Sequence, residues 1–151
     1  MRMETILWAL LGIVAGACIA TQAPINAQLG RALNVPIAAA GVSFVAGAVV
    51  LWAIAFAYSH FADIPINFGA PAPWTFVAGG LLGAIYVFSN IMLTPMIGAA
   101  AVMALSVAGQ LVGGMLLDKI GFMGMAVREI SMGRLAGAAL LVAGALMIRI
   151  F

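Results

Sequence analysis

The sequence predicts an all-α integral membrane protein with five transmembrane helices, and composition is the first reason. Of its 151 residues, 66% are hydrophobic and only 7% are charged. Soluble globular proteins carry about a quarter charged residues, so this chain cannot cover a water-facing surface with polar groups. The net charge of +2 is also too small to indicate nucleic acid binding.

The second reason is the length and spacing of the apolar runs. Each run is close to the ~20 residues that cross a hydrocarbon core of ~30 Å, and proline or charged residues separate the runs. We treat residues 1–151 as a single transmembrane domain with five spans, at roughly 5–21, 36–58, 74–93, 98–117 and 133–150, and the sequence leaves open that the first span continues past Pro24. Near the proposed ends lie Trp8, Trp52, Tyr58 and Trp74, whose rings favour the headgroup region.

An odd number of spans puts the two ends of the chain on opposite sides of the membrane. A second copy appended directly would insert upside down, and inverted repeats of this kind build many transporters. The Lys and Arg residues divide four to two between the sides: Arg2, Lys119, Arg128 and Arg134 against Arg31 and Arg149. This bias favours an amino terminus in the cytoplasm without excluding insertion in both orientations.

Three spans carry a stripe of uncharged polar side chains at helical spacing. The stripes are Gln22 with Asn26, Tyr86 with Asn90, and Ser106 with Gln110. An unpaired amide in hydrocarbon costs a few kcal/mol, so these groups should face one another or a wet cavity. Pro24 should kink its helix and free backbone acceptors beside Gln22. The stripes either line a substrate cavity or serve as contacts between helices, and the first could also cap a helix near the interface.

Small residues at helical spacing form a second pattern, and they let helix backbones approach closely. The sets are Gly12 with Gly16, Gly79 with Gly83, Gly109 with Gly113, and Gly133 with Gly137 and Gly144. Packing within one chain accounts for part of this pattern. The last set lies on a span with few polar residues, which makes it a candidate for contact between chains.

Five runs of the chain carry a family resemblance: QAPINAQLG, AAAGVSFVAGAVVL, GGLLGAIYVFSNIMLTPMIGAA, GQLVGGMLLDKIGFMG and GRLAGAALLVAGALMI. They resemble the YdcZ-type family of five-helix proteins in the drug/metabolite transporter (DMT) superfamily, over nearly the whole chain. The most specific elements are residues 22–30, the Ser43-Phe44-x-x-Gly47 step, and residues 109–121.

The resemblance implies that this chain is half of a ten-helix inverted-repeat transporter fold. Members of the superfamily commonly have ten helices in two inverted halves, and the last helix of each half is associated with joining them. By this analogy, the expected dimer interface is Gly133, Gly137 and Gly144.

The residue types that are absent from the spans exclude some classes of function. No acidic or basic residue lies in the middle of a proposed span. The related small multidrug resistance proteins depend on a glutamate in their first helix, and LWALLGIVAGACIA has none, so proton-coupled export of cations by that mechanism is not expected. A neutral or zwitterionic solute suits the amides, hydroxyls and aromatic rings present. With no metal-ligand cluster and no nucleophile beside a base, we expect no enzyme, no metal and no cofactor.

The expected function is therefore a DMT-type transporter half in the bacterial inner (plasma) membrane. It would move a small neutral or zwitterionic organic metabolite by alternating access, as an antiparallel homodimer or as a heterodimer with a five-helix paralogue. The alternatives are a non-transporting membrane assembly or interaction subunit, and a flippase for a lipid-linked molecule. A transporter half needs a water-accessible path to Asn26 and Gln110, whereas an assembly subunit needs only a dry interface.

Overall fold

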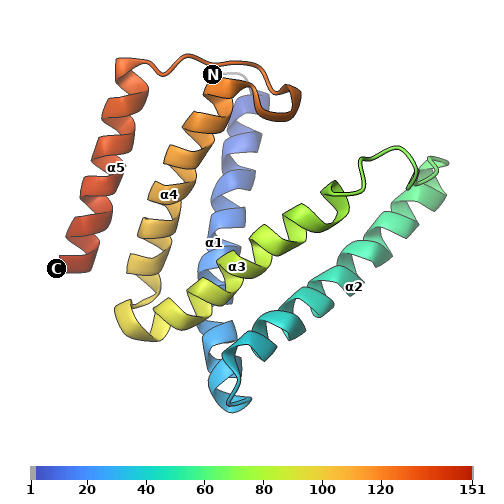
Figure 1. The fold of residues 1–151 in the computed structure, drawn as a ribbon, viewed down its shortest axis with the longest axis horizontal. Coiled ribbons are helices and arrows are strands. Elements are labelled where there is room, and N and C mark those ends of the chain that lie inside the picture. Colours follow the sequence, from blue (N-terminus) through green and yellow to red (C-terminus); the bar gives the residue numbers. More distant parts are fainter. Residues whose placement is uncertain (1–2, 151) are drawn as a thin grey trace. The chain divides into compact units, whose positions relative to one another are not determined.

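The computed structural model describes residues 3–150, apart from the side chain of Arg149, and these residues form helices and the connections between them (Figure 1). The elements are α1 (Met3–Ala32), α2 (Pro36–Ala62), α3 (Thr75–Ile97), α4 (Ala99–Ile120), the short 3-10 turn η1 (Phe122–Gly124) and α5 (Met132–Ile150). Helices α1 to α4 are long and apolar enough to cross a membrane, and α5 is a shorter apolar helix. The all-helical prediction is confirmed for the described residues. Of the charges counted above, Arg2 and the side chain of Arg149 lie outside the description.

Two helices run through prolines beyond the ends of the predicted spans. Helix α1 continues past residue 21, through Pro24, to Ala32, an extension that the sequence left open, and α3 continues through Pro95 to Ile97, where the sequence predicted a break. A proline removes only one N–H from the helix, and membrane helices tolerate the loss when neighbouring groups satisfy the freed carbonyl. Gly98, with a φ of 82°, alone separates α3 from α4. A kink at Pro24 stays a prediction.

The chain divides into two compact units, Met1–Pro95 and Met96–Phe151, and each is described by itself. In the first unit, α1 and α2 meet at a tight connection in which Asn34 has a φ of 55° and Pro36 opens α2. Small residues make this contact possible: a Cβ added at Gly30 would lie 3.2 Å from the Cα of Pro36 and 3.3 Å from a side-chain carbon of Ile91. Ala39 and Ile91 belong to the buried cluster at this end of the unit.

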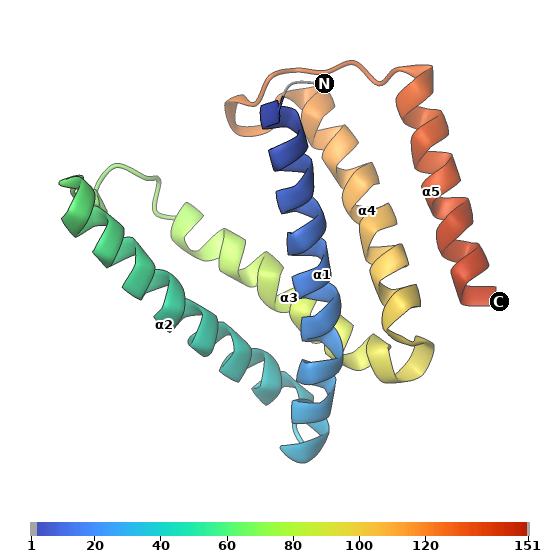
Figure 2. The same cartoon turned by 180° about the vertical axis from the view of Figure 1, so that it is seen from behind.

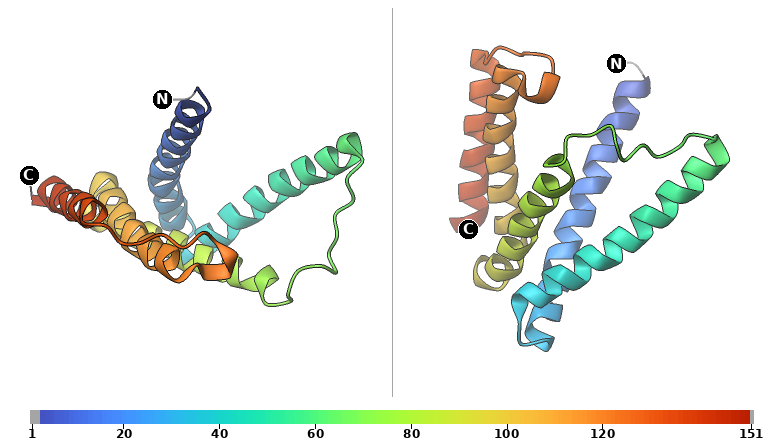
Figure 3. Two further views of the ribbon diagram at one scale, coloured as in Figure 1. Left: turned by 90° about the horizontal axis from the view of Figure 1, so that it is seen from above. Right: turned by 45° about the vertical axis from the view of Figure 1, so that its right-hand side comes forward.

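Away from that connection, α1 and α2 diverge (Figures 1 and 3). Every residue from 3 to 18 of α1 is exposed, and these include large apolar side chains such as Trp8 and Leu11. Helix α3 returns against α2, where a Cβ at Gly83 would lie 3.1 Å from the ring of Phe44. The exposed apolar surface suits contact with lipid or with another membrane chain.

In the second unit, α4 and α5 lie side by side in opposite directions (Figure 2). Helix α4 ends at Ile120, and it is closed by Gly121, whose φ of 62° lets its N–H bond the carbonyls of Asp118 and Leu117. This left-handed residue is a common way to close a helix, and glycine adopts it without a steric penalty. Ala138 and Ala145 of α5 are buried in the described structure.

Candidate functional site

Three uncharged polar side chains of the first unit meet between α1 and α2. The side-chain amide of Gln22 donates a hydrogen bond to the hydroxyl of Ser43 at 3.3 Å, and the amide of Asn26 donates to the same oxygen at 3.2 Å. We call Gln22, Asn26 and Ser43 the amide–serine cluster. Gln22 and Asn26 are one turn apart on α1, and both amides point at Ser43, which belongs to none of the predicted stripes.

The cluster retains hydrogen-bonding capacity after these two bonds are made. A serine oxygen accepts two hydrogen bonds and donates one, so the Ser43 hydroxyl can still donate. Each amide keeps its carbonyl oxygen and a second N–H. Asn26 is only 5% exposed, while the Gln22 side chain is exposed. The cluster can therefore offer both donors and acceptors to a molecule beside it without offering a charge.

Two grooves border the cluster. The larger, of about 590 Å³, is lined by Val14, Ala17, Cys18, Thr21, Gln22, Ile25, Asn26 and Ser43. The smaller, of about 290 Å³, is lined by Gln22, Ser43, Phe44, Gly47, Ala48, Leu51 and Val87. Gln22 and Ser43 border both grooves, and no lining residue is Asp, Glu, Lys, Arg or His. The arrangement suits a ligand with a polar but uncharged or internally neutralised group and an apolar remainder.

The other predicted site residues do not join this cluster. On α3, Tyr86 is half-buried and Asn90 is 5% exposed, and no hydrogen bond among residues 3–150 links either side chain to the cluster. On α4, in the second unit, Ser106 is half-buried and Gln110 is exposed. Their roles in a cavity stay predictions, as does that of Pro24.

Sequence reasoning missed Ser43 and Phe44 as site residues. Ser43 is a single hydroxyl in AAAGVSFVAG, with no polar neighbour at helical spacing, so no stripe drew attention to it. The available signal was the Ser43-Phe44-x-x-Gly47 step, which carried the family resemblance but received no role. Phe44 borders the smaller groove and also an entirely apolar groove of about 360 Å³ between α2 and α3.

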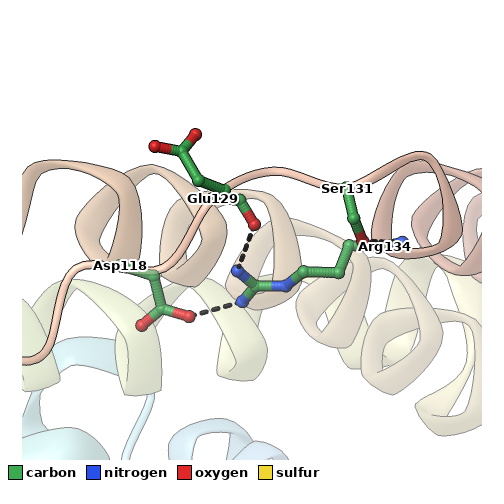
Figure 4. Close-up of polar contacts among 4 residues, drawn as sticks. All are labelled: Asp118, Glu129, Ser131 and Arg134. Atoms are coloured by element: carbon green, nitrogen blue, oxygen red, sulfur yellow. Dashed lines mark hydrogen bonds and ion pairs between the residues drawn. The ribbon is translucent and has the colours of Figure 1, made fainter.

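The clearest charged contact lies in the second unit, at the ends of two helices (Figure 4). Arg134, in the first turn of α5, forms an ion pair with Asp118, in the last turn of α4, and also donates to the backbone carbonyl of Glu129 at 3.4 Å. The backbone N–H of Arg128 donates to the Asp118 carbonyl at 3.0 Å. This contact fastens the α4–α5 connection. Among the residues that the structure describes, no group of three or more His, Cys, Asp or Glu residues could hold a metal ion.

Comparison with known proteins gives a family. The family described as "Putative inner membrane exporter, YdcZ" matches residues 7–147. Inner membrane protein YdcZ of Escherichia coli (strain K12) is 43% identical over 72 residues, which are 48% of this chain and 47% of that protein. The alignment thus spans about half the length of this relative. No solved structure matches.

These matches agree with the helices. The matching family is one of inner membrane proteins, and this chain has four long apolar helices and a shorter fifth. Together, these findings indicate a multi-pass protein of the inner membrane. The family description also points to a transporter rather than an enzyme. Since the family match covers nearly the whole chain, the chain belongs to the YdcZ family of inner membrane proteins.

Proposed function

We propose that this chain is one half of a DMT-type transporter that moves a small neutral or zwitterionic organic metabolite across the inner membrane by alternating access. The observation that carries the proposal is the amide–serine cluster, which borders two grooves and contains no charge. The exporter description of the family supports transport as the activity. Substrate sites near the middle of membrane helices are typical of such transporters.

The chemistry of the cluster favours this substrate class. Amides and hydroxyls bind polar groups by hydrogen bonds and do not require a counter-charge. A zwitterion could also bind, because its charges neutralise each other and each can use a donor or an acceptor of the cluster. A free cation or anion would find no charged partner in the residues that line the two grooves.

The proposal includes a second five-helix chain in the opposite orientation. The Gln22 amide is exposed, and so is the neighbouring face of α1. On this side, therefore, neither α1 nor α2 closes the larger groove. A polar group at membrane depth is stable only beside protein or cavity water, so a partner chain would complete the enclosure. An inverted partner would restore the ten-helix arrangement of relatives.

Helix α5 supports the expected interface between chains in part. Apart from neighbouring backbone of its own helix, a Cβ added at Gly137 would have no described atom within 4 Å, and one at Gly133 would meet only the Ser131 hydroxyl, at 3.9 Å. Both positions are therefore open to a partner. Gly144 borders a groove of about 450 Å³ that also includes Ala104 and Val107 of α4.

Water access to the cluster tests the transport proposal. In a Cys18→Ser background, nearly all copies of Gln22→Cys should react with a membrane-impermeant maleimide in right-side-out vesicles and also in inverted vesicles. Alternating access exposes every copy to each side in turn, whereas a static chain inserted in both orientations would expose each copy to one side only. Val45→Cys is the matched control, since Val45 is exposed on α2 but borders neither groove. We expect no labelling of Val45→Cys from either side.

The same experiment separates the alternative function. In a non-transporting assembly subunit, the two hydrogen bonds to Ser43 would only hold helices together, and Gln22→Cys would stay unlabelled from both sides. That result would contradict the transport proposal. Labelling from one side only would show that the site of the protein in these vesicles does not open to both sides in turn.

Topology and crosslinking test the antiparallel pair. Reporters fused to the carboxyl terminus should detect both orientations if the same chain pairs with itself, or one orientation if a paralogue supplies the inverted half. In either case, a photoreactive crosslinker attached to Gly133→Cys in the Cys18→Ser background should capture an inverted partner. If no inverted partner is ever crosslinked, the dimer proposal is wrong.

A further inference from the structure

The connection between α2 and α3 folds back along α2. The ring of Phe68, in this connection, lies 5.8 Å from the ring of Trp52, and Trp52 stacks on Phe56 at 5.3 Å. Trp52 is ten residues before Ala62, the last residue of α2. At 1.5 Å per helical residue, Trp52 lies about 15 Å before the end of α2, so the Phe68 ring reaches back from the connection to a ring that starts well inside the helix. We call Trp52, Phe56 and Phe68 the aromatic anchor.

The backbone of this connection is not suited to the hydrocarbon core. Residues 63–74 are not helical, and between Ile64 and Gly69 the described backbone N–H bonds are those of Ile64 to the Ser59 carbonyl and Gly69 to the Asn67 side chain. Irregular backbone that faces lipid does not occur in the hydrocarbon region, because its N–H and C=O groups would lack partners. The backbone of residues 64–69 must therefore lie where water or lipid headgroups reach it, and the Trp52 ring lies within reach of a side chain from this region.

The side chains of the same connection are not suited to bulk water. Ile64, Phe68 and Trp74 are each more than half exposed. Aromatic and branched apolar side chains beside irregular backbone match the chemistry of the interface, which is apolar on one side and hydrated on the other.

We propose that the aromatic anchor binds the lipid headgroup interface and sets the depth of the first unit in the membrane. The hydrocarbon crossing of α2 is then residues 36–52, and residues 53–62 extend through the headgroup region. This crossing of 17 residues is about 24 Å long, at the short end of what crosses a bilayer. It ends six residues earlier than the span 36–58 predicted from the sequence.

This depth has a consequence for the amide–serine cluster. Along α2, Ser43 lies about 10 Å from Pro36 and about 14 Å from Trp52. A tilt of the helix shortens both distances by the same factor, so Ser43 stays close to the middle of the crossing. The anchor thus puts the cluster near the bilayer midplane, and this inference does not depend on whether the protein transports anything.

Depth-dependent fluorescence quenching tests the proposal directly. A variant with Trp8→Phe and Trp74→Phe keeps Trp52 as its only tryptophan. It is reconstituted in phosphatidylcholine vesicles that carry bromine either near the headgroup or near the end of the acyl chains. We expect the Trp52 fluorescence to be quenched at least about twofold more strongly by the shallow bromine, because the ring lies at the interface.

A deeper tryptophan on the same helix is the matched control. Val45 is exposed and lies two turns from Trp52, so V45W with Trp8, Trp52 and Trp74 all changed to Phe probes the level of the cluster. We expect the opposite order of quenching for V45W. If the deep bromine quenches Trp52 more strongly than the shallow one, the proposal is overturned.

A second variant tests the part played by the connection. Phe68→Ala in the variant that retains only Trp52 should move the Trp52 emission to longer wavelength, since the indole loses an apolar neighbour and gains water. Unchanged emission would show that the returning connection does not anchor this ring. Neither result depends on a substrate, so the transport proposal is tested separately.

Discussion

The two units of the molecule join their helices with different chemistry. In the first unit, α1 and α2 are connected by neutral amides that share one serine hydroxyl, part way along both helices. In the second unit, α4 and α5 are connected by the ion pair of Asp118 and Arg134, at the ends of both helices. The first contact lies beside two grooves, whereas the second stabilises the connection between α4 and α5.

The difference follows from where each contact lies along its helix. A charged side chain in the middle of a membrane helix is expensive, but near an end it can reach the headgroups and water. Asp118 and Arg134 are each about 30% exposed, as expected for a contact that is only partly removed from solvent. Neutral amides cost less to bury, so they can be placed deeper and still leave donors and acceptors for a ligand.

The largest effect is expected where the first unit depends on close backbone contact. Gly30→Val should lower the free energy of unfolding by about 2 to 3 kcal/mol, because its Cβ would press on the Cα of Pro36, which is backbone and cannot rotate away. Thermal unfolding of the purified protein measures this change. Gly12→Val is the control on the same helix, since a Cβ there meets no described atom within 4 Å. Equal losses in both variants would contradict the proposed α1–α2 contact.

A smaller effect is expected from the cluster itself. Ser43→Ala should lower the free energy of unfolding by about 1 kcal/mol, because the amides of Gln22 and Asn26 lose their shared acceptor. Ser89→Ala is the control, since the Ser89 hydroxyl bonds only the carbonyl of Ile85 in its own helix. In a double-mutant cycle, Asn26→Ala should reduce the cost of Ser43→Ala. Strict additivity would show that the Asn26–Ser43 hydrogen bond contributes nothing.

The ion pair of the second unit should contribute less to the free energy of unfolding. Asp118→Asn should lower the free energy of unfolding by about 0.5 kcal/mol, because partly exposed ion pairs are screened by water and salt. Glu129→Gln is the control, since its carboxylate points away from Arg134 (Figure 4). The difference between the two variants should shrink at high salt. If Asp118→Asn lowers the free energy of unfolding more than Ser43→Ala does, then the charged contact stabilises its unit more than the amide contact does, contrary to this prediction.

The helices were easier to predict from the sequence than the site. Each apolar run is long enough to identify its helix, and the predicted span 133–150 differs by one residue from α5 (Met132–Ile150). Helix ends were harder, because Pro24 and its polar neighbours resemble a break, although a membrane helix can continue through one proline. The sharing of one face by Gln22 and Asn26 follows from helical spacing alone.

The partner of that face could not be predicted in the same way. Which residue of α2 meets Asn26 depends on the contact between Gly30 and Pro36, which sets how α2 leaves the connection. A lone serine among alanines and glycines has no periodicity of its own, so only the fold reveals that Ser43 is the shared acceptor. The fold-back of Phe68 onto Trp52 is equally a tertiary contact, without a local pattern in residues 63–74.

The smallest effect on the stability of the single chain is expected at the exposed glycines of α5. A substitution there distinguishes the folding of one chain from the assembly of two chains. Gly137→Leu should change the free energy of unfolding by no more than about 0.5 kcal/mol, since a Cβ added there meets no described atom within 4 Å apart from the neighbouring backbone of its own helix, so the longer side chain starts into open space. It should nevertheless reduce crosslinking of an inverted partner through Gly133→Cys several-fold, because a leucine would hold the partner helix away from α5. Ala143→Leu, at another exposed position of α5, should alter neither quantity. If Gly137→Leu destabilises the chain and leaves crosslinking unchanged, this glycine serves the packing of its own chain, and the second unit offers no open face for a partner at that position.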